Sequence, residues 1–227
     1  MPRVDQLYSA LLKDVSVDAT EVLAEGLLLA DPESAVRIAE ILVERRSESA
    51  WMALACRYRV LPTTIREKMS RRADWLTPGL SAALRRPEPE LRCNALELLA
   101  AHPRPELAYR AAEYVADASP AVREVAQRTL VRLAEAGLGA APEVRRQLAS
   151  ALRDTLRIFE RHRSPEVLRA ALWYAAEIED DLWRVLGAVN GTAPQVVSRS
   201  LKDWADPRLA GFLLLALAQQ NWHRAAQ

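Results

Sequence analysis

Apolar residues recur at intervals of three and four positions along nearly the whole chain, with charged residues between them. Within residues 120–136, Val122, Val125, Leu130 and Leu133 share one face, and arginine and glutamate side chains occupy the other. This period is that of an amphipathic α-helix. The pattern predicts helices near residues 3–13, 18–30, 32–46, 48–60, 63–73, 78–86, 89–101, 104–117, 120–136, 142–162, 165–177, 179–189, 194–204 and 207–224.

A residue that can cap a helix is followed directly by proline at five places in the chain. Proline fits the first turn of a helix, and a serine, threonine or aspartate before it can accept a hydrogen bond from a free backbone N–H. The five prolines lie about 42–46 residues apart, within the range of about 40–47 residues for helical repeats. We therefore expect a helix to begin at each of the pairs Asp31-Pro32, Thr77-Pro78, Ser119-Pro120, Ser164-Pro165 and Asp206-Pro207.

Three segments align on an apolar residue, an arginine and a small residue: SAVRIAEIL from Ser34, ELRCNALELL from Glu90 and AVREVAQRTL from Ala121. They resemble the D-P-x-V-R-x-x-A signature that opens the helices of HEAT-like repeats, and the similarity covers most of residues 31–218. The resemblance implies an all-α fold, a right-handed α-solenoid of stacked antiparallel helix pairs or triplets of HEAT or armadillo type. Such a stack has an extended concave face.

The positions of these helix-opening prolines also indicate the size of the repeat unit and the domain boundaries. The cap-proline pairs favour a unit of three short helices, whereas the 31 residues between Pro89 and Pro120 favour a unit of two. Residues 1–30 contain no pair of a capping residue and a proline, so we expect them to form amino-terminal capping helices. They would continue into a solenoid over residues 31–227 as a single domain, because short helices gain their stability from stacking on neighbours.

Composition indicates a soluble, folded chain with 50% hydrophobic and 27% charged residues. The longest apolar run, residues 209–218, is too short to span a bilayer, and the amino terminus has acids where a signal peptide needs an apolar stretch. We therefore expect a cytoplasmic protein with no membrane association. Cys56 and Cys93 stand among apolar neighbours, which favours buried thiols over a disulfide or a zinc site.

Motifs for catalysis or metal binding are absent from the sequence. His102, His162 and His223 are widely separated, and there is no HExxH, G-x-S-x-G, P-loop or G-x-G-x-x-G segment. The repeated His-Glu pairs of metal-binding HEAT-type hydroxylases are also missing. We expect no catalytic residues, metal or cofactor, and we interpret the acids at 179–181 as residues that complement a helix amino terminus.

Four arginines are predicted to form a ridge on the helix at 142–162. At 100° per residue, Arg146, Arg153, Arg157 and Arg161 fall within about 80° of one face. Guanidinium groups in such a row can bind carboxylates or phosphates of a partner. The solvated face of an ordinary amphipathic helix is the simpler explanation, and it applies equally to the basic residues at 57–72.

The sequence favours a non-enzymatic scaffold or adaptor that binds another protein along the concave face. The alternative is a HEAT-like nucleic-acid-binding protein, including a DNA glycosylase, since glycosylases of this kind use a tryptophan with an acid. Trp173 is followed one turn later by Glu177, although packing in the core explains Trp173 more simply. The net charge of +1 is not that of a dedicated nucleic-acid binder. A continuous positive strip would favour nucleic acid, and a face of mixed charge a protein.

Overall fold

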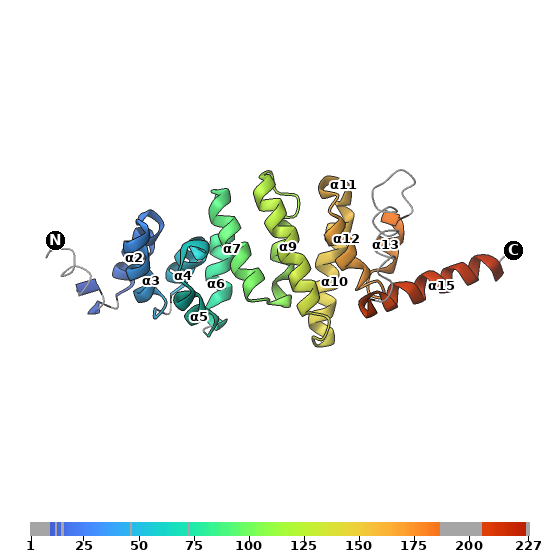
Figure 1. The fold of residues 1–227 in the computed structure, drawn as a ribbon, viewed down its shortest axis with the longest axis horizontal. Coiled ribbons are helices and arrows are strands. Elements are labelled where there is room, and N and C mark those ends of the chain that lie inside the picture. Colours follow the sequence, from blue (N-terminus) through green and yellow to red (C-terminus); the bar gives the residue numbers. More distant parts are fainter. Residues whose placement is uncertain are drawn as a thin grey trace. The chain divides into compact units, whose positions relative to one another are not determined.

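The computed structural model describes residues 10–186 and 206–225, except residues 12, 15, 46 and 72, with the backbone alone for residues 73–76 and 219–225. Throughout these residues every regular element is a helix (Figure 1). The expected all-α class is therefore confirmed for the described part of the chain. The helix predicted at 194–204 lies outside it, as does most of the one predicted at 3–13.

The chain divides into two compact units, Met1–His102 and Pro103–Gln227. The described elements of the first unit are α2 (Val17–Leu29), α3 (Pro32–Leu42), α4 (Glu48–Cys56), the 3₁₀-helix η1 (Tyr58–Val60), α5 (Thr63–Ser70), α6 (Ala73–Leu84) and α7 (Pro89–Ala101). Helix α2 packs on α3 and α4, and α4 packs in turn on α6 and α7. Helix α4 therefore lies at the centre of these contacts, and the core includes Trp51, Met69 and Leu96.

Helices α4 and α6 approach each other closely at Gly79. A Cβ atom on this glycine would lie 2.4 Å from Trp51 Cβ and 2.8 Å from the backbone nitrogen of Met52. Real Cβ atoms do not approach so closely, so only glycine allows the two helices to pack at this distance. This contact holds Trp51 fully inside the unit, where its indole Nε1 donates to the carbonyl of Arg45 at 3.2 Å.

The described elements of the second unit are η2 (Pro105–Leu107), α8 (Ala108–Glu113), α9 (Pro120–Ala136), α10 (Pro142–Arg157), α11 (Phe159–His162), α12 (Pro165–Leu172), α13 (Glu179–Leu186), η4 (Pro207–Leu209) and α15 (Ala210–Ala225). Helix α8 packs on α9 and α10, α9 packs on α12, and α10 also contacts α12 and α13. Leu130, Leu152, Phe159 and Tyr174 are among the side chains that fill the core between these helices.

The cap-proline rule holds at some positions and is wrong at others. Asp31, Ser164 and Asp206 accept a backbone hydrogen bond at the start of a helix, as predicted. Ser119 precedes α9 but its side chain makes no capping bond. Thr77-Pro78 does not begin a helix, because Pro78 lies inside α6, which starts at Ala73. Packing of Gly79, Leu80 and Leu84 against the unit keeps this helix continuous through the proline.

Two long helices predicted from periodicity are shorter in the structure. The segment 142–162 is broken at Ile158 into α10 and α11, because Ile158 has φ −111° and ψ 20°, outside the helical region. Helix α12 ends at Leu172, and residues 173–177 form successive turns. In both places the chain just after the end of the helix also contains buried residues. The spacing of apolar residues therefore does not predict where these helices end.

No helix in the described residues is both long enough and apolar enough to cross a membrane. The expected division between a cap at residues 1–30 and an array at 31–227 stays a prediction. Both cysteines are buried as free thiols, in agreement with the sequence. Burial raises the pKa of the Cys56 thiol to about 12, so this group is neutral and inert at physiological pH.

Candidate functional site

The predicted arginine ridge begins on α10, whose buried face holds this helix in the second unit. Leu148, Leu152 and Leu156 point into the core, so the opposite face of α10 is directed to solvent. Arg153 and Arg157 stand one turn apart on that exposed side, with 38% and 57% of their side chains accessible. The helical period thus places two of the predicted residues next to each other, as the sequence indicated.

Helix α13 brings an aspartate against this pair of arginines. Asp181 lies in the first turn of α13, and its carboxylate is 3.4 Å from Arg153 Nε and 3.6 Å from Arg157 Nε. Arg184, one turn further along α13, reaches the same carboxylate at 3.0 Å. Arg153 also donates a hydrogen bond to the carbonyl of Glu177 at 3.2 Å. Three arginines therefore share one carboxylate, which is only 19% exposed.

An open hollow of about 460 Å³ lies between α10 and the start of α13. Its lining is almost wholly polar and of both signs, and it consists of Arg153, Arg157, Ala176, Glu177, Ile178, Glu179, Asp180 and Asp181. We call these residues and Arg184 the α10–α13 face. Asp180 is exposed on it, while Glu179 accepts a hydrogen bond from Trp183 Nε1 at 3.2 Å. The face therefore offers both cationic and anionic groups to a partner.

The other two predicted ridge residues do not line this hollow. Arg146 is exposed and pairs with Glu143 in the first turn of α10. Arg161 is exposed on α11, beyond the break at Ile158, so it does not continue the row of α10. The helix predicted over 142–162 is thus interrupted between Arg157 and Arg161, and all four arginines are on the surface. Their role in binding a partner stays a prediction.

Sequence reasoning missed Asp181 and Arg184 as members of this face. The acids at 179–181 were interpreted only as complements to a helix amino terminus, a role that their position in the first turn of α13 supports. The available signal was the spacing of Asp181 and Arg184 by one helical turn. Their meeting with Arg153 and Arg157 depends on the packing of α13 on α10, which no local pattern encodes.

Trp173 and Glu177, the pair behind the nucleic-acid alternative, are engaged inside the protein. Trp173 is only 8% exposed, and the guanidinium of Arg208 lies 4.5 Å from the centre of its ring. Glu177 Oε1 accepts hydrogen bonds from Arg145 Nε at 2.9 Å and Nη2 at 2.6 Å. Arg145 also stacks 4.9 Å from the ring centre of Tyr174. The ring of Trp173 is therefore covered, whereas Glu177 is paired with Arg145 through one oxygen and also lines the hollow.

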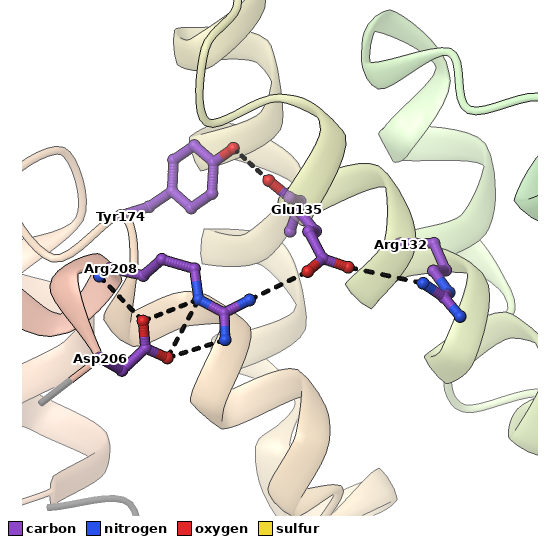
Figure 2. Close-up of polar contacts among 6 residues, drawn as sticks. Arg132, Glu135, Tyr174, Asp206 and Arg208 are labelled. Carbon is purple, nitrogen blue, oxygen red and sulfur yellow. Dashed lines mark hydrogen bonds and ion pairs between the residues drawn. The ribbon is translucent and has the colours of Figure 1, made fainter. Parts of the chain in front are cut away.

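Arg208 belongs to a polar cluster that ties η4 to α9 (Figure 2). It pairs with Asp206 at 2.8 Å and with Glu135 at 3.0 Å, while Arg132 approaches the other oxygen of Glu135 at 3.6 Å. The hydrogen bond from Arg208 holds the pKa of Asp206 below its usual value. Every charge in this cluster therefore has a partner within it, and the pair of Arg208 with Glu135 joins η4 to α9.

The described residues contain no group of three or more histidine, cysteine, aspartate or glutamate side chains that could hold a metal ion. His102 belongs to the first unit and His162 to the second, and the side chain of His223 lies outside the described residues. Burial lowers the pKa of both described histidines. The chain matches neither a known protein-family model nor a curated protein.

Proposed function

We propose that this protein is a non-enzymatic scaffold that binds another protein, and that its helices form a right-handed α-solenoid of HEAT or armadillo type. The packing order inside each unit supports the solenoid, since α2 contacts α3 and α4, and α8 contacts α9 and α10. A solenoid repeats this neighbour-to-neighbour contact and uses its concave surface for binding.

The α10–α13 face is the proposed binding surface within the second unit. The observation that carries the proposal is the sharing of Asp181 by Arg153, Arg157 and Arg184. Their exposed guanidinium groups are held in place by one carboxylate and retain donors for a carboxylate of a partner. Asp180 offers the opposite charge beside them. Alternating signs favour a protein whose own charges complement them and disfavour a uniformly anionic ligand.

The nucleic-acid alternative has less support from the same geometry. A polyanion is attracted by a continuous cationic surface, whereas acids of α13 interrupt this one. Trp173 is covered by Arg208 and cannot stack on a base without displacing it. This alternative stays a prediction, and binding of an oligonucleotide that weakens steeply with salt would favour it.

Capture of partners by the full chain tests the proposal. The informative variant carries Arg153→Glu and Arg157→Glu, which reverses both charges on the rim of the hollow. We expect it to lose the proteins that the wild-type chain captures from an extract, since like charges placed opposite each other cost several kcal/mol. Photo-crosslinking from position 154 identifies which of these proteins contact the face, because Asp154 is exposed and pairs with Arg157.

The matched control carries Arg37→Glu and Arg132→Glu, two exposed arginines that each have an acidic partner and lie outside the face. It undergoes the same change of net charge and should capture the same proteins as the wild type. Far-ultraviolet circular dichroism establishes that both variants are folded. Capture that is equal in all three chains would contradict the proposed binding surface.

A further inference from the structure

A second groove lies in the first unit, where the end of α2 approaches η1 and α7. It has a volume of about 330 Å³ and is lined by Glu25, Leu28, Leu29, Cys56, Arg57, Val60, Arg86, Glu88, Glu90, Leu91 and Asn94. We call it the α2–α7 groove. All of its lining comes from the first unit, so it is separate from the α10–α13 face.

The mouth of the groove exposes large apolar side chains. Leu29 is 87% exposed and Val60 is 56% exposed, and Leu28 and Leu91 beside them are partly exposed. Two branched apolar residues on the rim of one concave site are available to cover an apolar side chain of a partner. Apolar surface that is gathered at a groove in this way is typical of an interaction site.

The charged side chains that line the groove are two arginines and three glutamates, and they differ in their partners. Arg57 donates to the carbonyl of Ala30 at 3.0 Å, and Arg86 pairs with Glu88 at 3.5 Å. Glu25 and Glu90 are exposed, and among the described residues neither carboxylate has an ion-pair partner. Arg57 is thus held by a neutral carbonyl, and Glu88 is paired with Arg86. With Glu25 and Glu90 exposed, the lining carries three acids and two arginines, an excess of negative charge.

The polar groups of Asn94 and Cys56, which also line the groove, are not available to a ligand. Asn94 is buried, its Oδ1 accepts from the backbone nitrogen of Arg59 at 2.9 Å, and its Nδ2 donates to the carbonyl of Glu90 at 3.0 Å. Cys56 is a buried, neutral thiol. Recognition in this groove therefore depends on the apolar rim and on the two open carboxylates.

We propose that the α2–α7 groove binds a basic amphipathic segment of a partner protein. An apolar side chain of this segment packs between Leu29 and Val60, and flanking lysine or arginine residues pair with Glu25 and Glu90. An acidic segment is disfavoured because it would face these two exposed carboxylates on a lining in which acids outnumber arginines. The α10–α13 face is polar and of both signs, whereas the groove combines apolar side chains with exposed acids, so the two sites recognise different segments.

A synthetic amphipathic helix built only of leucine and lysine serves as the probe, with a leucine and glutamate helix as its acidic counterpart. Fluorescence anisotropy with the full chain measures binding of each labelled peptide. We expect the basic peptide to bind more tightly than the acidic one. Glu25→Lys with Glu90→Lys should weaken its binding about tenfold through repulsion at the rim. Leu29→Ser should weaken it about tenfold through loss of apolar contact.

Two variants of the second unit control for non-specific attraction of the peptide. Glu124→Lys reverses an exposed acid, and Leu217→Ser removes an apolar side chain that is 57% exposed. Both should bind the basic peptide as the wild type does. All substituted residues are exposed, so the variants retain the fold, which circular dichroism verifies.

Three outcomes would overturn the proposal. The first is that the groove variants bind the basic peptide as tightly as the wild type does. The second is that the wild type binds the acidic peptide as tightly as the basic one. The third is a wild-type dimer in solution that Leu29→Ser converts to a monomer, which would make the groove an interface between copies of this chain. None of these results bears on Arg153 and Arg157, so failure here is distinguishable from failure of the α10–α13 face.

Discussion

The hydroxyl of Tyr174 donates a hydrogen bond of 2.7 Å to the carbonyl of Ala134, which lies 40 residues earlier in the chain (Figure 2). Tyr174 is fully buried just after α12, and Ala134 belongs to the last turn of α9. Burial raises the pKa of Tyr174 to about 12, so the hydroxyl remains protonated and able to donate. This bond satisfies a carbonyl that has no partner within its own helix and fixes the end of α9 to the core.

Tyr174→Phe should destabilise the protein by about 1 kcal/mol, because the carbonyl of Ala134 loses its partner while the ring keeps its packing. Chemical denaturation followed by circular dichroism measures the change. Tyr109→Phe is the control, since Tyr109 is exposed and its hydroxyl contributes little. Equal stability of the two variants would show that the buried bond has no net value.

Gly79→Ala should destabilise the protein by about 1–3 kcal/mol, because the added methyl group collides with Trp51 and the backbone at Met52. The backbone cannot move aside as a flexible side chain would. Gly139→Ala is the matched control, since nothing lies within 4 Å of a Cβ at that position. Urea denaturation of both variants should separate them, and similar midpoints would contradict the close approach of α4 and α6.

Ser164→Ala and Ser119→Ala should differ although both residues precede a helix that begins with proline. The hydroxyl of Ser164 accepts from the backbone nitrogen of Val167 at 3.3 Å, so its loss should cost about 1 kcal/mol. Ser119 makes no side-chain capping bond, and its replacement should leave stability nearly unchanged. Thermal denaturation of the two variants tests this, and a larger loss at Ser119 would contradict it.

His162 should make folding stability sensitive to mildly acidic pH. Its Nε2 lies 3.0 Å from the carbonyl of Thr155, and its Nδ1 accepts from the backbone nitrogen of Ser164 at 3.0 Å. The bond that Nδ1 accepts requires the neutral ring, whereas Nε2 donates to Thr155 in either protonation state. Burial is the larger effect and lowers the pKa of His162 below the value of 6.5 expected in the unfolded chain. The unfolded state therefore binds the proton more readily, and stability falls as pH drops from about 6.5 through the lowered folded pKa.

His162→Gln should remove part of this pH dependence, which the denaturation midpoint measured between neutral and mildly acidic pH reveals. His102→Gln is the natural comparison, because burial also lowers the pKa of His102. Each substitution should flatten the profile in part, and the double variant should flatten it further. A profile that is unchanged in His162→Gln would exclude this histidine as a source of the pH sensitivity.

Local patterns predicted the helices best where capping, proline and period agree. Residues 89–101 and 120–136 form helices with the predicted bounds, because a proline marks each start and the apolar period runs unbroken to the end. The proline signal is wrong at Pro78, which lies inside α6. There the helix continues past the proline, and Gly79 packs directly against Trp51. That contact joins residues 28 positions apart, beyond the reach of any local rule.

The candidate site shows the same division between local and distant information. Periodicity placed Arg153 and Arg157 on one exposed face because neighbouring turns of a single helix share a side. It did not predict the break at Ile158, which separates Arg161 from the helix that carries these two residues. The sequence also did not predict the exposed acids of the α2–α7 groove. Whether an acid finds a basic partner depends on which helices pack together.

The sequence by itself determined that the chain is helical and which side of each helix is buried, because propensity, capping and period act over a few residues. Only the tertiary structure decided that Asp181 joins three arginines and that Leu29 and Val60 line one groove with Glu25 and Glu90. These meetings depend on the packing of α13 on α10 and of α7 near η1. The free energy of such packing comes from surfaces that are distant in sequence, so no short segment encodes it.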